Sequence, residues 1–291
     1  MSKEIKIGLI GAGWMGKAHT TAFHNARMIF GDDMPVFELV SDVSEDAVAK
    51  FAKDMGYNRY TTNWMDVVAD PEIDLVDVAT PNCMHYEMAK AALEHGKHVF
   101  CEKPLATSLE DAKKVVEAEK ASGKRLLQIG FVRRFDPDYI KMKKILDSGE
   151  LGAPLMAHCI SRTRSHPKNH TTEQHITNIA IHEIDICRWL LGENLNEVAV
   201  RFPRATCFAE CTCQDPQLVL MQSDSGVLID VEVSGNSYYG YEILCELVCE
   251  KGTIRLPVAA EPIVRSYLPC GQALPEDWTH GFVVAYQEQL Q

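Results

Sequence analysis

The sequence predicts an α/β protein with two domains. Residues 1–130 are expected to form a doubly wound parallel sheet, and residues 131–291 an α+β domain whose open-faced sheet is mostly antiparallel. In the first part, short apolar segments alternate with helical segments that end at glycines, as in parallel strands joined by helical crossovers. After Phe131, longer strands with period-2 alternation dominate, joined by turn sequences such as Asp224-Ser225-Gly226.

The elements of the first domain are predicted in chain order from two signals. Apolar runs bounded by turn residues predict buried strands, and helical spacing followed by glycine predicts a helix and its end. The predicted strands cover residues 5–10, 37–41, 75–79, 99–101 and 126–129. One helix is predicted directly after Gly16, and three more are predicted at residues 45–55, 86–95 and 109–121.

The second domain is predicted to contain one long helix among strands. Alternation of apolar and polar residues predicts the strands, while the apolar spacing of residues 176–191 is helical. The predicted strands cover residues 155–161, 198–202, 218–222, 227–234, 242–249 and 253–256.

Composition excludes several classes of function. The net charge of −12 argues against nucleic acid or an anionic membrane surface as the main partner. The charged start of the chain is not a signal peptide and no apolar stretch could span a bilayer, so we expect a cytoplasmic protein.

The ten cysteines are scattered, mostly in apolar runs. Only Cys207, Cys211 and Cys213 cluster, without a second pair at zinc-like spacing, so no metal is expected.

A glycine-rich turn points to a dinucleotide cofactor. Gly11-Ala12-Gly13-Trp14-Met15-Gly16 joins a predicted strand to a predicted helix, and Asp42 ends the next strand. In a Rossmann domain such a turn lets a pyrophosphate approach the helix N-terminus, and the acidic residue binds the ribose hydroxyls. The carboxylate of Asp42 would repel a 2′-phosphate, so NAD is favoured over NADP. The alternative is an ordinary glycine turn with a solvated Asp42.

Two further strand ends carry polar residues. Thr80-Pro81-Asn82 and His85 follow one strand, and Glu102-Lys103-Pro104 follows another. Loops at the carboxyl ends of parallel strands line the cofactor crevice, where a lysine could stabilise a developing alkoxide. The simpler alternatives are an N-capped turn at Asn82 and a lysine paired with Glu102. The residues predicted to bind the cofactor are Gly11, Gly13, Trp14, Met15, Gly16, Asp42, Thr80, Pro81, Asn82, His85 and Glu102.

The helix of the second domain carries a polar stripe. In an α-helix, Asn178, His182 and Asp185 would lie on one face of an otherwise apolar segment. A histidine has a pKa suited to accepting a hydroxyl proton near neutral pH, so His182 is the candidate base. Asp185 is expected to pair with Arg188.

These motifs resemble those of the Gfo/Idh/MocA oxidoreductases over nearly the whole chain. The second half is most similar to the inositol 2-dehydrogenases of that family. The markers of this second likeness are Arg133-Arg134-Phe135-Asp136, Thr171-Thr172, Tyr239-Gly240-Tyr241-Glu242 and Asp277-Trp278.

The resemblance implies NAD-dependent oxidation of a hydroxyl of a cyclic polyol or sugar. Lys103 would polarise the hydroxyl, His182 would accept its proton, and Asn178 would orient the histidine in place of the family's usual aspartate. It also implies a homotetramer, and a chain that ends short of the family's usual length. Substrate contacts are expected from Arg133, Arg134, Arg162, Thr163, His166, Tyr239 and Tyr241, although the arginines could be structural.

Two alternatives stay open on this sequence. The protein could be a sugar or glucoside dehydrogenase of the same family, or a non-catalytic NAD(H)-binding regulator.

Overall fold

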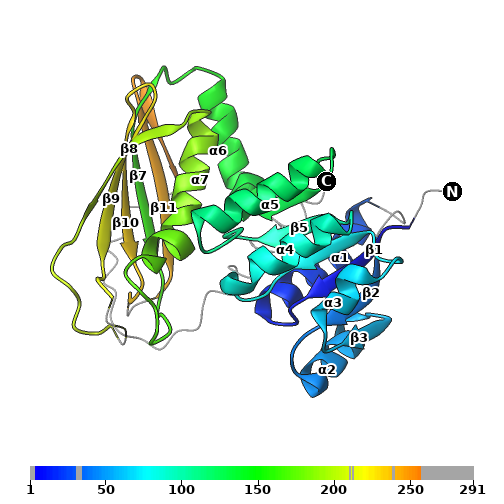
Figure 1. Cartoon of the computed structure of the whole chain (residues 1–291). Coiled ribbons are helices and arrows are strands. Elements are labelled where there is room, and N and C mark those ends of the chain that lie inside the picture. Colours follow the sequence, from blue (N-terminus) through cyan, green and yellow to red (C-terminus); the bar gives the residue numbers. More distant parts are fainter. Residues whose placement is uncertain (1–3, 31–34, 210, 212, 238–239, 257–291) are drawn as a thin grey trace. The chain divides into compact units, whose positions relative to one another are not determined.

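The computed structural model describes residues 4–30, 35–209, 211, 213–237 and 240–256, with the side chains of residues 27–30 left out. They form two compact units, which divide between Val132 and Arg133 (Figure 1).

The first unit contains a six-stranded parallel sheet in the order β3-β2-β1-β4-β5-β6. The prediction of a doubly wound parallel sheet is confirmed. Its strands are β1 (Lys6–Ile10), β2 (Val36–Ser41), β3 (Arg59–Thr61), β4 (Leu75–Val78), β5 (His98–Glu102) and β6 (Leu127–Gly130). Its helices are α1 (Trp14–Phe30), α2 (Glu45–Met55), α3 (Trp64–Ala69), the 3₁₀ turn η1 (Asn82–Met84), α4 (His85–Glu94) and α5 (Leu109–Ala121).

Helices cover both faces of this sheet because successive side chains of a strand point to opposite sides. On β1, Ile10 belongs to a core with Val67 of α3 and Met88 of α4. Its neighbour Leu9 belongs to a different core, with Val48 of α2. The strand order reverses at β1, so the loops after β1 and β4 diverge and leave a crevice at the carboxyl ends of the strands.

The second unit contains a six-stranded mixed sheet in the order β12-β11-β7-β10-β9-β8. Only β7 and β10 pair in parallel, so the prediction of a mostly antiparallel sheet is confirmed. The strands are β7 (Pro154–Arg162), β8 (Leu195–Arg201), β9 (Gln217–Ser223), β10 (Leu228–Ser234), β11 (Glu242–Cys249) and β12 (Gly252–Leu256).

Helices α6 (Pro137–Asp147) and α7 (Ile181–Leu191) lie along one face of this sheet (Figure 1). Ile186 and Leu190 of α7 form one core with Val231 of β10 and Leu247 of β11. The 3₁₀ turn η2 (Val132–Phe135) precedes α6. Residues of β9 alternate between buried and half-buried, as expected of strands with one covered face.

The structure corrects the predicted helix of residues 176–191. Residues His175–Ala180 form a π-helical segment, η3, and only Ile181–Leu191 is α-helical. Because a π-turn holds more residues than an α-turn, the α-helical stripe drawn through Asn178, His182 and Asp185 does not hold across this junction.

Five of the seven free cysteines in the described part of the chain behave as small buried apolar residues. Cys101, Cys159, Cys187, Cys245 and Cys249 are free and buried, in agreement with the prediction. Cys211 and Cys213 form a disulfide. Within the part of the chain that the structure describes, no helix has the length and apolar character needed to cross a membrane.

Candidate functional site

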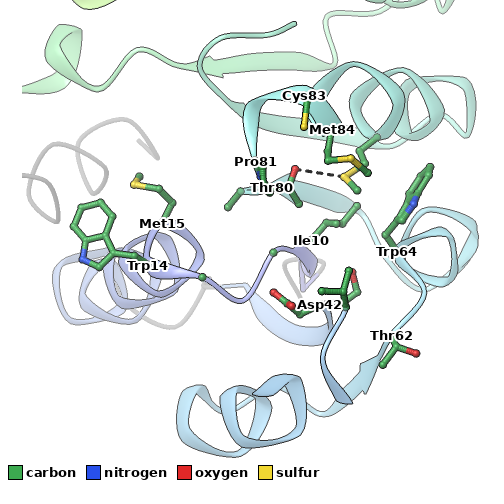
Figure 2. Close-up of a pocket in the computed structure, with 16 residues that line it drawn as sticks. Ile10, Trp14, Met15, Asp42, Thr62, Trp64, Thr80, Pro81, Cys83 and Met84 are labelled. Carbon is green, nitrogen blue, oxygen red and sulfur yellow. Dashed lines mark hydrogen bonds between the residues drawn. The ribbon is translucent and has the colours of Figure 1, made fainter. Parts of the chain in front are cut away.

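A cavity of about 690 Å³ lies at the carboxyl edge of the parallel sheet, within the first unit. It is bordered by the loops after β1, β2 and β4 and by the start of α3. Trp14 and Trp64 lie on opposite sides of it (Figure 2). The lining residues are Ile10, Gly11, Gly13, Trp14, Met15, Ser41, Asp42, Val43, Thr62, Trp64, Ala79, Thr80, Pro81, Cys83, Met84 and Met88.

The glycine turn is tightly packed at its first and third glycines. Gly11 has a φ of +104°, which favours glycine, and a side-chain carbon there would lie 2.5 Å from the carbonyl oxygen of Ala79. The Gly11 N–H donates to the carbonyl oxygen of Ser41 at 2.9 Å. A carbon added to Gly16 would lie 2.1 Å from the Gly11 carbonyl oxygen, so α1 can approach β1 closely only without a side chain here.

Gly13 differs from its two neighbours in the motif. A carbon added there would meet no described atom within 4 Å, and Gly13 lines the cavity. It immediately precedes α1, whose first turn has N–H groups without partners inside the helix. The glycine therefore leaves the backbone open toward the cavity, where an anionic group such as a pyrophosphate could approach the helix N-terminus.

Asp42 lies beside this turn, as Figure 2 shows. Its Oδ2 accepts a hydrogen bond from the Ala12 N–H at 2.9 Å, which ties the end of β2 to the loop after β1. The carboxylate lines the cavity together with Val43, whose side chain is 93% exposed. Thr62 and Trp64 also line the cavity and were not predicted. The sequence pattern around them is weak, because β3 and α3 are too short to show the apolar periodicity of a strand or a helix.

The predicted residues after β4 separate into two groups. Thr80 and Pro81 line the cavity, whereas Asn82 and His85 are not among the lining residues. The buried ring of His85 lies between two backbone carbonyls, with Nδ1 2.7 Å from the Pro104 oxygen and Nε2 2.8 Å from the Thr80 oxygen. His85 thus holds the loop after β4 against the loop that follows Lys103, and its contact with a cofactor stays a prediction.

Glu102 is buried behind Lys103 in a network that the sequence did not indicate. Its Oε2 accepts the Lys103 N–H at 3.1 Å, and its Oε1 lies 3.2 Å from Nε2 of His19. Nδ1 of His19 lies 3.0 Å from both carboxylate oxygens of Asp77 on β4. A histidine of α1 therefore connects the ends of β4 and β5.

This network fixes the charge of His19. Burial by itself lowers the pKa of the imidazole, but the carboxylates of Asp77 and Glu102 outweigh it and raise that pKa to about 10. The ring is therefore an imidazolium at neutral pH. The peptide bond between Lys103 and Pro104, after Glu102, is cis.

In the second unit, the structure replaces one predicted ion pair by another. The carboxylate of Asp185 accepts a hydrogen bond from Nε of Arg134 at 2.8 Å and a second one from Nη2 of the same arginine. Arg188, the predicted partner, donates instead to Oδ1 of Asn194 at 2.8 Å. The prediction of an Asp185–Arg188 pair is wrong, because Arg134 presents two parallel donors to the carboxylate.

All three arginines predicted to contact substrate are held by carboxylates, Arg134 by Asp185 and the other two by glutamates. Arg133 pairs with the buried Glu183, whose charge outweighs the effect of burial and raises the pKa of the guanidinium. Arg162 donates through Nε and Nη2 to Glu232 at 2.6 Å and through Nη1 to Glu242 at 2.7 Å. Alternation along β7 places Arg162 on the sheet face away from α7. A contact of any of these three arginines with substrate stays a prediction.

The remaining predicted residues of this unit have distinct surroundings. Asn178 and His182 are both half-buried, on η3 and α7. Thr163 follows β7, and its buried hydroxyl has no hydrogen-bond partner among the described residues. Tyr241 is half-buried before β11, and Tyr239 lies outside the described residues.

His166 lies in a cluster of three histidines with His170 and His175. Burial and the neighbouring rings lower the pKa of both His166 and His170 to about 4.

Comparison with known protein families accounts for both units. Residues 5–131 match the model of the oxidoreductase family GFO_IDH_MocA with an NAD-binding Rossmann fold, and residues 139–255 match the GFO/IDH/MocA C-terminal domain. The chain belongs to the GFO/IDH/MocA oxidoreductase family. The family resemblance drawn from the motifs is therefore confirmed.

Individual members of the family are similar over almost the entire chain. An inositol 2-dehydrogenase of Klebsiella pneumoniae is 40% identical over 99% of this chain and 84% of its own length. A myo-inositol dehydrogenase of Lactobacillus casei, solved with NAD(H) and myo-inositol, has a TM-score of 0.85 at 32% identity and covers 99% of this chain and 85% of its own. A levoglucosan dehydrogenase solved with NADH has a TM-score of 0.78 at 29% identity, over 87% of this chain and 73% of its own.

Proposed function

We propose that this protein is an NAD-dependent dehydrogenase that oxidises a secondary hydroxyl of a cyclic polyol or sugar to a ketone. The observation that carries the proposal is the open backbone at Gly13 beside the carboxylate of Asp42, in a chain 40% identical to an inositol 2-dehydrogenase.

The lining of the cavity in the first unit suits the pyrophosphate and ribose of NAD. Gly13 leaves room for a pyrophosphate at the start of α1, and Asp42 offers a carboxylate oxygen to ribose hydroxyls, which disfavours a 2′-phosphate. Met84 and Met88 form an apolar part of the cavity wall. When bound, NAD accepts the hydride from the carbinol carbon.

We assign the proton chemistry to Lys103 and His182. The ammonium group of Lys103 donates to the substrate oxygen and favours its developing negative charge, while the imidazole of His182 accepts the hydroxyl proton. Asn178 orients His182 or a substrate hydroxyl. Glu102 holds the backbone of Lys103 through its hydrogen bond at 3.1 Å.

The first test is NAD reduction by the purified protein across a panel of inositol stereoisomers, pyranoses and anhydrosugars. We expect turnover with an inositol, measured by the absorbance of the reduced nicotinamide. Higher kcat/KM with a pyranose or anhydrosugar would favour the sugar dehydrogenase alternative, which the likeness to levoglucosan dehydrogenase supports. Tight NAD binding without turnover on any substrate would favour the regulator.

A second test separates binding from folding at the glycine turn. Gly13→Ala places a carbon where no described atom lies within 4 Å, so unfolding free energy should change by less than about 0.5 kcal/mol. The same carbon obstructs the pyrophosphate, and Kd for NAD should rise roughly tenfold or more. Calorimetric titration with NAD and denaturant unfolding measure the two quantities.

Gly16→Ala provides the contrasting variant. Its added carbon clashes with the Gly11 carbonyl oxygen, so it should lower unfolding free energy by about 1–3 kcal/mol. Equal loss of stability in both variants would contradict the assignment of Gly13 to cofactor binding.

We also propose a cytoplasmic homotetramer that packs through the open faces of the second unit's sheets. On the face away from α7, half-buried Leu244 of β11 and Ile160 of β7 are paired neighbours, and Glu232 of β10 separates Ile160 from Leu218 of β9. The pair of Leu244 and Ile160 is an apolar contact suited to packing against another copy.

A further inference from the structure

Three histidines of the second unit converge between the end of β7 and the start of η3. His166 and His170 lie in the connection, and His175 is the first residue of η3. The rings of His166 and His170 stack with centroids 3.8 Å apart, and the His175 ring lies 5.1 Å and 4.9 Å from them. One ring nitrogen of each histidine lies within 4.8 Å of the other two.

Each histidine has a buried nitrogen without a hydrogen-bond partner among the described residues. These atoms are Nε2 of His166, Nε2 of His170 and Nδ1 of His175. The exposed fraction is 6% for His170 and 0% for His175, so solvent does not readily replace the missing partners. A buried polar atom left without a hydrogen-bond partner destabilises the folded protein. Three such atoms in rings that contact one another indicate a ligand that accepts a lone pair from each ring.

The neighbours of His175 orient its ring for such a ligand. Its Nε2 lies 3.2 Å from Oδ1 of Asp215, which is fully buried. Asp215 is itself fixed by the Gly235 N–H at 2.9 Å and by Nδ2 of Asn236 at 2.8 Å. When Nε2–H donates to this carboxylate, Nδ1 carries the lone pair. Metal-binding histidines in proteins are commonly oriented by a carboxylate in this way.

Gly235 leaves the space that His166 occupies. A side-chain carbon at this position would lie 1.7 Å from Nε2 of His166. A larger residue on the loop after β10 would therefore displace the ring from the cluster.

We propose that His166, His170 and His175 bind a divalent transition metal ion, and that Zn²⁺ is the ion this donor set favours. Three neutral imidazoles with a second-shell carboxylate suit tetrahedral zinc, with the fourth position left to water. Zinc–nitrogen bonds of about 2.0–2.1 Å bring the ligand atoms to roughly 3.3 Å from one another, so side-chain rotations must draw the rings together. The ion would fasten the connection after β7 to η3, which carries Asn178.

The test uses protein without an affinity tag, stripped with a chelator, incubated with excess Zn²⁺ and desalted. Elemental analysis should find about one zinc ion per chain. The zinc-loaded protein should also unfold at a higher temperature than the stripped protein, because the ion binds the folded state. The variant His170→Gln should retain little zinc, and its Tm should not respond to the ion.

The control is His98→Gln, which removes an exposed histidine of the first unit and should retain zinc fully. A second measurement needs no variant: Co²⁺ in place of zinc should give the visible absorption of a tetrahedral nitrogen and oxygen site, without a thiolate charge-transfer band. Wild-type protein that retains no metal, a thiolate band, or equal zinc in His170→Gln would overturn the proposal. None of these readouts depends on dehydrogenase activity.

Discussion

Replacing Lys103 by alanine should reduce kcat for polyol oxidation by about 10²–10³-fold, the usual cost of losing one donor to a developing oxyanion. Lys103 directly follows β5 at the carboxyl edge of the parallel sheet, and it is not among the residues that line the cavity. Kd for NAD should therefore change little. Steady-state kinetics and calorimetric titration with NAD measure the two quantities.

The matched control for this substitution is Lys113→Ala on α5, an exposed lysine of the same unit. It should leave kcat and Kd unchanged. Wild-type turnover in Lys103→Ala would refute the role of the ammonium group, whereas a parallel loss of NAD binding would show that Lys103 supports the cavity instead.

Replacing His19 by glutamine should lower unfolding free energy at neutral pH by roughly 3–5 kcal/mol, as when one partner of a buried ion pair is removed. His19 and Asp77 are each 1% exposed and Glu102 is 6% exposed. Without the imidazolium, the carboxylates of Asp77 and Glu102 would stay buried and lose the positive charge that His19 supplies. Glutamine keeps some hydrogen bonding, so the loss reports mainly the charge.

The pH dependence of this stability follows from the raised pKa of His19. In the folded protein that pKa is about 10, above the ordinary value of 6.5. The stabilisation is therefore fully present below about pH 6.5 and is lost as pH rises through about 10. Unfolding free energy of the wild type should fall across this window more steeply than that of His19→Gln.

Denaturant titrations at several pH values measure both curves. Other groups that titrate in this range are common to the two proteins, so the difference between the curves isolates His19. Parallel curves would show that His19 carries no charge in the folded state. His98→Gln serves as the control, because that histidine is exposed and should leave the pH profile unchanged.

Local signals predicted many elements well. Helices α2 and α5 begin and end where the sequence placed them, because Ser44 and Ser108 cap their first turns and a glycine with positive φ follows close after each. The short β3 and α3 were not predicted, nor was α6, although Pro137 stands at its start and Asp136 caps it. No predicted strand of the second sheet was misplaced by more than a few residues.

The histidine cluster could be predicted only in part from local sequence patterns. His166, His170 and His175 follow one another at spacings of four and five residues, a pattern that a search of histidines alone could have found. Their significance depends on Asp215 and Gly235, which β9 and β10 bring from distant parts of the chain.

The sequence by itself determined the alternation of strands and helices, the family and the cofactor turn, because capping, periodicity and glycine conformation act between near neighbours. Only the tertiary structure decided which charges meet. Arg133 pairs with Glu183, Arg162 with Glu232, and His19 lies between Asp77 and Glu102. A buried charge takes the partner that the packing of distant strands and helices brings within reach, and no spacing along the chain specifies that distance.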